Sequence, residues 1–145
     1  MLIGWIQFSN AFRNKYLAVH KTIGKIYIVC VLLSSIAGMY IAFYATGGWV
    51  TTLAFVTLDI NWFYATLAAF VAIKKGNIAR HQHLMIYSYA ATFGAVTLRI
   101  WLPLTTLILG NFFKAYPIAA WLAFVPNMVV AYFIVRKKAA QMNAA

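Results

Sequence analysis

The positive charges of this chain gather in three short clusters, and long stretches almost free of charge separate them. The clusters lie at 13–25, 74–80 and 136–138, and the apolar runs between them are 26–46, 49–73, 84–109 and 117–135. Each run has about 20 residues or more, enough at about 1.5 Å per residue to cross about 30 Å of hydrocarbon. The pattern therefore predicts an integral membrane protein.

Composition and lipid solvation together predict an all-α fold. The chain is 65% hydrophobic and 9% charged, with a mean hydropathy of +0.82. In lipid, the backbone N–H and C=O groups must find their hydrogen-bond partners within their own segment. Four such runs therefore favour a polytopic transmembrane helical bundle. We expect a single domain over 1–145, with four full spanning helices and a short N-terminal helical segment at 1–9. That segment is too short to span, so it is either an interfacial piece or the tail of a longer helix that is missing here.

The basic clusters also predict an orientation. A chain that starts inside and crosses four times puts all three clusters on one side, while the opposite loops carry only Lys114. Loops rich in Lys and Arg stay in the cytoplasm, so we expect a multi-pass protein of the cell inner membrane with the basic loops and the C-terminus cytoplasmic. The formal charge of +11 is explained by this bias. A nucleic-acid partner is not expected, because no groove-reading module is visible.

Two ionisable residues, Asp59 and Arg99, lie well inside apolar runs. A charge there is costly unless it is paired or solvated, and both residues fall at about the same depth on consecutive helices. The sequence therefore predicts a salt bridge, with Asn61 at a similar level. This group is either a structural ion pair or part of a polar site that binds a ligand or relays protons. Asn127, beside Pro126 in the last run, is expected to line a small polar space.

The sequence contains no residue pattern typical of a hydrolytic enzyme. Whether the protein is an enzyme of another kind stays open. Asp59 is the sole acidic residue, so paired carboxylates for acid–base catalysis are impossible. No serine stands in an elbow motif, and no carboxylate stands beside a histidine.

The histidines are predicted to share one membrane level, at the end of the bundle that carries the three basic clusters, here called the basic end. A zinc site needs three or four ligands, more than this end offers, but a haem needs only two axial ligands. The pattern predicts a b-type haem site in which His20 and His81, opposite one another, would ligate the iron. Lys25 and Arg80 would lie near the propionates. His83 is two residues from His81 and points to another face of the helix.

Several stretches of the chain resemble an uncharacterised family of bacterial predicted membrane proteins. The resemblance covers nearly the whole chain and is carried by these stretches: Gly4-x-x-Gln7-Phe8-Ser9, His20-Lys21-x-x-Gly24-Lys25-x-Tyr27, Gly76-Asn77-Ile78-Ala79-Arg80-His81, Met85-Ile86-x-Ser88-Tyr89-Ala90, Ala95-Val96-Thr97-Leu98-Arg99-x-Trp101-Leu102-Pro103 and Ala120-Trp121-Leu122-x-x-Val125-Pro126-Asn127.

The resemblance implies which residues belong to the family pattern. Asp59 and His83 fall outside it, and Tyr132 stands where members often have a glutamate. Members generally begin with a further helix that carries a histidine and leads into the segment that here starts at Gly4, so either the start of this chain is assigned too late or the helix is absent in this protein. The residues that match the pattern are His20, His81, Arg99, Trp101, Pro103, Pro126 and Asn127. In addition, the His-Lys-x-x-Gly sequence at His20 is similar to the His-x-x-x-Gly that opens a haem-carrying helix in transmembrane b-type cytochromes.

Two functions remain open from the sequence. The first is a haem b protein that passes electrons near the cytoplasmic face to a quinone or a partner subunit. The second is a non-catalytic accessory subunit of a larger membrane complex, for example a respiratory one, with other subunits or copies of itself as partners.

Overall fold

A computed structural model describes residues 16–143, and this part of the chain is four long helices without strands. The helices are α3 (Leu17–Ala42), α4 (Trp49–Lys74), α5 (Ile78–Leu109) and α6 (Phe112–Asn143). All four are long and apolar enough to cross a membrane. The predicted all-α, four-helix transmembrane architecture is therefore confirmed. The expected N-terminal segment at 1–9 lies outside the described residues.

Short polar and glycine-rich turns set the helix ends. Asn77 caps α5, since its side-chain Oδ1 accepts a hydrogen bond from the backbone N–H of Arg80 at 2.9 Å. Gly110 ends α5 in the left-handed conformation, with a φ of +61°. The helix α4 agrees with the predicted run 49–73, but the others extend beyond their apolar runs at the basic end. Helical structure continues into polar residues there because they lie in the aqueous interface, where charge is tolerated.

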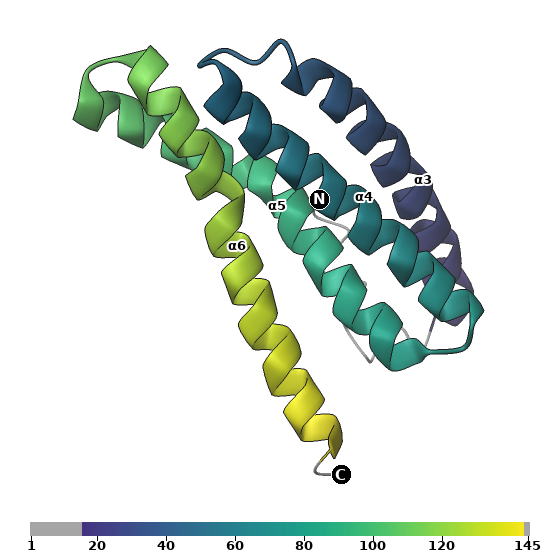
Figure 1. Cartoon of the computed structure of the whole chain (residues 1–145). Coiled ribbons are helices and arrows are strands. Elements are labelled where there is room, and N and C mark those ends of the chain that lie inside the picture. Colours follow the sequence, from purple (N-terminus) through teal and green to yellow (C-terminus); the bar gives the residue numbers. More distant parts are fainter. Residues whose placement is uncertain (1–15, 144–145) are drawn as a thin grey trace.

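Helix α4 lies at the centre of the bundle and packs against each of the other three helices (Figure 1). Successive helices are antiparallel, and α5 packs most extensively against α6. The buried core consists mainly of alanines, joined by Phe124. Small side chains allow close helix approach in lipid, where apolar burial itself gives no driving force. Gly94 is an example, because an added Cβ would lie 3.6 Å from the Ala123 carbonyl oxygen on α6.

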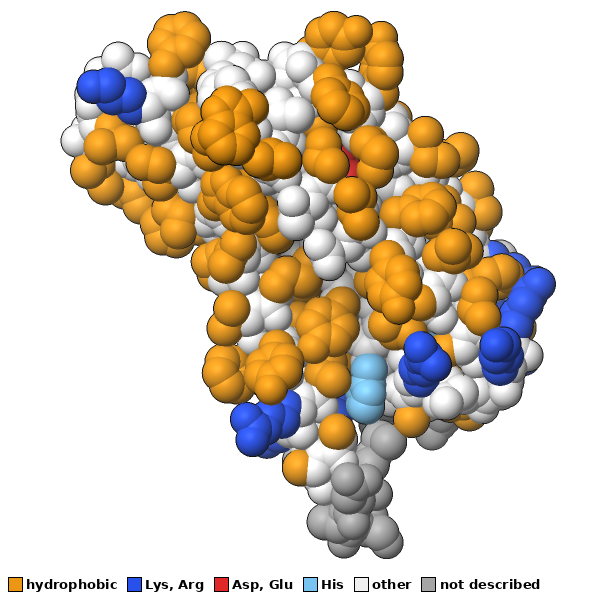
Figure 2. Space-filling model, viewed as in Figure 1, with side chains coloured by type: hydrophobic (Ala, Val, Ile, Leu, Met, Phe, Trp, Pro, Cys, Tyr) orange, Lys and Arg blue, Asp and Glu red, His pale blue; other side chains and the backbone are white. Residues whose placement is uncertain are grey.

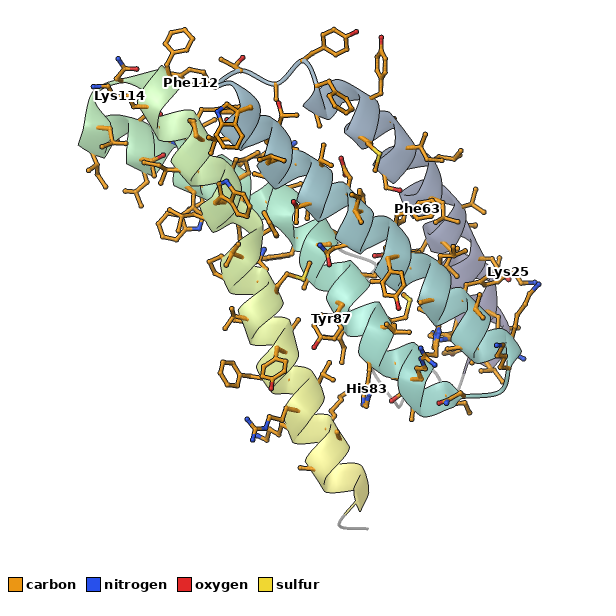
Figure 3. All side chains as sticks on the ribbon, viewed as in Figure 1. Lys25, Phe63, His83, Tyr87, Phe112 and Lys114 are labelled. Atoms are coloured by element: carbon orange, nitrogen blue, oxygen red, sulfur yellow. The ribbon has the colours of Figure 1, made fainter. Side chains whose placement is uncertain are left out.

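The outer surface is apolar, and its charge is concentrated at the ends (Figure 2). Large hydrophobic side chains are exposed along all four helices, as expected for surfaces that face lipid. Lys25 and His83 lie at one end of the bundle, whereas Phe112 and Lys114 lie at the other (Figure 3). The basic clusters within the described residues therefore gather at a single end.

The prolines inside the apolar runs do not end their helices. Helix α5 continues through Pro103, and α6 continues through Pro117 and Pro126. Helix α6 changes direction along its length, and its C-terminal half diverges from the rest of the bundle (Figure 1). A proline lacks the N–H that would bond to the preceding turn, so a bend in α6 is the expected result.

Candidate functional site

His81 is held on α5 by a contact to the neighbouring helix. Its Nδ1 lies 2.8 Å from the backbone carbonyl oxygen of Ala69, a fully buried residue of α4. A carbonyl oxygen can only accept, so Nδ1 donates its proton, and in the neutral imidazole Nε2 then keeps a free lone pair. A histidine oriented in this way has the tautomer that metal and haem ligands use.

A cluster of hydroxyl groups joins α3, α4 and α5 farther from the basic end. The Tyr27 hydroxyl lies 2.9 Å from both Ser88 Oγ and Thr92 Oγ1, and Ser88 Oγ lies 2.6 Å from Thr66 Oγ1. Thr66 and Ser88 are fully buried. This cluster was not predicted from the sequence, because isolated Ser and Thr residues in an apolar run do not indicate which helix they face.

The hydroxyl cluster fixes how α3 and α5 face one another. His20 stands seven residues before Tyr27, and His81 stands seven residues before Ser88. Seven residues are about two helical turns, so each histidine lies on the same helix face as the hydroxyl-bearing residue that follows it. Both helices run away from the basic end, and Tyr27 contacts Ser88 directly. His20 and His81 therefore each lie about two turns from this contact, toward the basic end, and His81 itself points at Ala69 of α4.

Asp59 does not pair with Arg99, and the predicted salt bridge is wrong. The Asp59 carboxylate turns toward α3, where a Cβ added at Gly38 would lie 2.8 Å from both carboxylate oxygens. Arg99 lies on α5 and is exposed. Equal depth on consecutive helices was the basis of the prediction, but depth does not define the helix face, and these two residues point to different neighbours.

The other predicted polar residues form separate contacts. Asn61 is exposed, and its amide donates to the carbonyl oxygen of Thr57 on its own helix at 2.8 Å. The Asn127 amide on α6 donates to Thr97 Oγ1 on α5 at 3.1 Å and to the Ala123 carbonyl oxygen at 2.9 Å. Asp59, Asn61, Arg99 and Asn127 thus do not assemble into one site.

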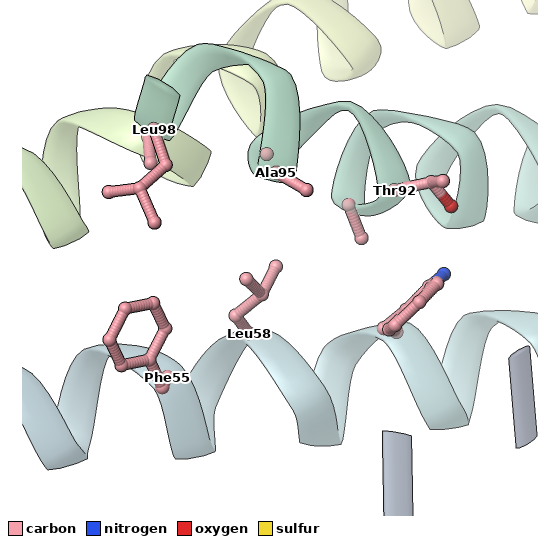
Figure 4. A pocket seen from close by; sticks show the side chains of 9 residues that line it. Phe55, Leu58, Thr92, Ala95 and Leu98 are labelled. Carbon is pink, nitrogen blue, oxygen red and sulfur yellow. The ribbon is translucent and has the colours of Figure 1, made fainter. Parts of the chain in front are cut away.

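An apolar cavity of about 140 Å³ lies between α4, α5 and α6 (Figure 4). Phe55 and Leu58 face Ala95 and Leu98 across it. Trp62 also lines this cavity, and its Nε1 is buried without a hydrogen-bond partner in the described structure. A second, more open cavity of about 430 Å³ lies along α3 beside Phe63 of α4.

Within residues 16–143, no group of three or more His, Cys, Asp or Glu side chains could hold a metal ion.

Comparison with known proteins identifies the family. No curated protein and no solved structure matches the chain, so the similarity to b-type cytochromes stays a prediction. A family model described as predicted membrane protein (DUF2306) matches residues 1–135. The match covers the four apolar runs and the histidines at the basic end. The chain therefore belongs to the DUF2306 family of predicted membrane proteins.

Proposed function

We propose that the protein is an electron-transfer protein of the inner membrane that binds a b-type haem at its basic end, with His20 and His81 as axial ligands. The observation that carries this proposal is the Tyr27–Ser88 contact of 2.9 Å, which sets the register of α3 against α5. That register supports a pair of histidines at one level on these two helices, and two axial ligands are the minimum set for six-coordinate haem iron.

The residues around the histidines fit such a group chemically. The Nδ1–H of His81 donates to the Ala69 carbonyl, which leaves Nε2 as the nitrogen that can bind iron. Lys25 and Arg80 are exposed at the same end of the bundle and would supply positive charge for the propionates. When bound, a haem would supply one-electron chemistry, and the protein would orient it and tune its potential. A quinone or a partner subunit would exchange the electrons.

The proposed orientation puts the basic end in the cytoplasm. The support is the segregation of charge, since Lys and Arg favour cytoplasmic loops. A Cys30→Ser background with Lys114→Cys or Lys75→Cys tests this in intact spheroplasts with a membrane-impermeant maleimide. We expect Lys114→Cys to be labelled directly and Lys75→Cys only after permeabilisation. The reverse pattern would overturn the orientation.

An absorbance spectrum of the detergent-purified protein, before and after dithionite, tests the haem. We expect a Soret band and sharpened α and β bands on reduction. His20→Ala and His81→Ala should abolish the pigment, whereas His83→Ala is the matched control and should retain it. A flat spectrum at full protein concentration, unchanged by added haemin, would overturn the redox proposal.

A second candidate, an accessory subunit of a larger membrane complex, is favoured by the shape of α6. Its C-terminal half diverges from the bundle and exposes apolar side chains, including Val129, Val130, Phe133 and Ile134 (Figure 1). A helix from another subunit or a second copy would cover this face. This function predicts a colourless protein that co-purifies with partners from native membranes, and isolation as a lone monomer would contradict it.

A further inference from the structure

Trp62 carries a hydrogen-bond donor without an acceptor in the middle of a membrane span. It stands near the centre of α4, about 20 Å from either end of that helix. Its indole Nε1 is buried, and it has no hydrogen-bond partner in the part of the chain that the structure describes. A buried N–H without an acceptor is unfavourable, and no bulk water reaches this depth to replace one. The unpaired donor is therefore a candidate ligand-binding group.

Trp62 belongs to the wall of the apolar cavity between α4, α5 and α6, whose volume is about 140 Å³. The wall residues of α4, which are Phe55, Leu58 and Trp62, are three and four positions apart and so lie on one face of the helix. Figure 4 shows Phe55 and Leu58 facing Ala95 and Leu98 of α5 across the cavity. An apolar cavity of about 150 Å³ is large enough to hold benzene, so this cavity has room for one six-membered ring.

The other polar side chain of the cavity wall, that of Thr92, already has its hydrogen bonds. Its Oγ1 donates to the Ser88 carbonyl oxygen at 2.9 Å and lies 2.9 Å from the Tyr27 hydroxyl. None of the residues that line the cavity is ionisable. Among the side chains of the wall, Trp62 alone has an unused hydrogen-bonding group, and an indole N–H can only donate.

We propose that this cavity binds the ring of an uncharged, lipophilic carbonyl compound, the class to which membrane quinones belong, with the Trp62 N–H donating to a ring carbonyl oxygen. The carbonyl supplies the acceptor that Trp62 lacks, and the ring fills the apolar space. Phe55 and the indole of Trp62 provide aromatic surfaces against which a planar ring packs. Ala95 in the wall is exposed, so the cavity opens to the lipid-facing surface, and a compound dissolved in the bilayer reaches it there.

The chemistry of the wall selects this class of ligand over other occupants. A lipid acyl chain would fill the volume, but it has no acceptor and would leave the Trp62 N–H unpaired. A water molecule needs about two to four polar partners, and the side chains of the wall offer one free donor. A charged ligand would find no counter-charge among the lining residues, at a depth where an unpaired charge is costly.

The cavity lies close to the histidines along the same helix. Trp62 stands seven residues from Ala69, whose carbonyl oxygen binds His81, so the two positions are about 10 Å apart along α4. A quinone in the cavity would therefore lie about two helical turns from the proposed haem ligand. A role of the ligand as an electron partner rests on the proposed function, whereas its binding does not.

The experiment uses the full chain in lipid nanodiscs, with duroquinone and durene as matched probes. Both carry the same methyl groups on a six-membered ring, but only duroquinone has carbonyl oxygens. Equilibrium dialysis against empty nanodiscs subtracts the partitioning of each probe into lipid. We expect saturable binding of duroquinone to the wild type and about a tenfold loss of its affinity in Trp62→Phe, which removes the donor. Durene should bind Trp62→Phe at least as tightly as the wild type, because the smaller side chain only adds room.

Two further variants locate the binding site. Trp49→Phe is the matched control, because it makes the same change at an exposed residue at the end of α4, and it should bind duroquinone like the wild type. Ala95→Leu fills the cavity and should abolish the saturable binding of both probes. Circular dichroism and size-exclusion chromatography establish that the variants are folded.

Three results would overturn the proposed ligand site. They are the absence of saturable duroquinone binding to the wild type, equal affinity of duroquinone for the wild type and folded Trp62→Phe, and undiminished binding to folded Ala95→Leu. None of them would change the absorbance spectrum that tests the haem. A colourless protein that binds duroquinone through Trp62 would in turn overturn the redox function and leave the ligand site in place.

Discussion

Polar groups occur in both halves of the bundle, but they meet different surroundings. Toward the basic end, Tyr27, Thr66, Ser88 and Thr92 share hydrogen bonds across three helices. In the other half, Asp59 faces the bare backbone of Gly38. The first arrangement satisfies its polar groups and stabilises the bundle, since bonds of this kind join helices in lipid. The second leaves a carboxyl group without a basic partner among the described residues, which is typical of a functional residue and costs stability.

The largest change in the free energy of unfolding should come from filling the space at Gly38. We expect Gly38→Leu to lower the free energy of unfolding by about 3 kcal/mol, because a Cβ alone would already collide with the Asp59 carboxylate. Unfolding in mixed micelles with increasing SDS measures this. Gly24→Leu is the matched control on the same helix, since nothing lies within 4 Å of a Cβ at Gly24. Equal effects of the two changes would show that the α3–α4 contact is not as close as described.

Replacing Asp59 with a neutral residue should change the free energy of unfolding in the opposite direction. We expect Asp59→Asn to raise the free energy of unfolding by about 2 kcal/mol at neutral pH, because an amide is less costly than a charge in hydrocarbon. The same SDS titration measures the gain. A loss of stability would mean that the carboxylate has a stabilising partner, and the contrast between the two halves of the bundle would fail.

The smallest of the three effects concerns the hydroxyl cluster. We expect Ser88→Ala to lower the free energy of unfolding by about 1.5 kcal/mol, because Tyr27 and Thr66 both lose a partner, and each such bond contributes about 0.6 kcal/mol or somewhat more in a membrane. Thr52→Ala is the control, since the Thr52 hydroxyl bonds only to the Gly48 carbonyl of its own helix. If both variants unfolded like the wild type, the hydroxyl cluster would not stabilise the half of the bundle nearer the basic end.

Helix boundaries show what a hydropathy pattern can predict. Helix α4 agrees with its apolar run because glycines bound it at one end and lysines at the other. Helix α5 begins at Ile78, six residues before the predicted start at Leu84, because Asn77 caps it outside the apolar run. An asparagine after a glycine was the available signal for that start. Helix α6 begins before Pro117, although the apolar run suggested a start at that residue.

The candidate sites were less accessible to prediction than the helices. His20 and His81 were paired from their shared membrane level, and that pairing stays a prediction, although the Tyr27–Ser88 contact links their two helices. The same reasoning failed for Asp59 and Arg99. Depth follows from the number of residues between a position and the membrane edge, whereas the facing direction depends on how each helix is rotated against its neighbours.

The sequence by itself determined that this chain spans a membrane, that its spanning segments are helical and that its basic residues gather at one end. Those properties depend on the transfer of side chains and backbone groups between water and hydrocarbon, which local composition sets. Only the tertiary structure decided that Asp59 meets Gly38, that Asn127 reaches Thr97 and that three helices share their hydroxyls. Helix rotation in lipid is set by close packing of small residues and by interhelical hydrogen bonds, and neither leaves a periodic trace in so uniformly apolar a sequence.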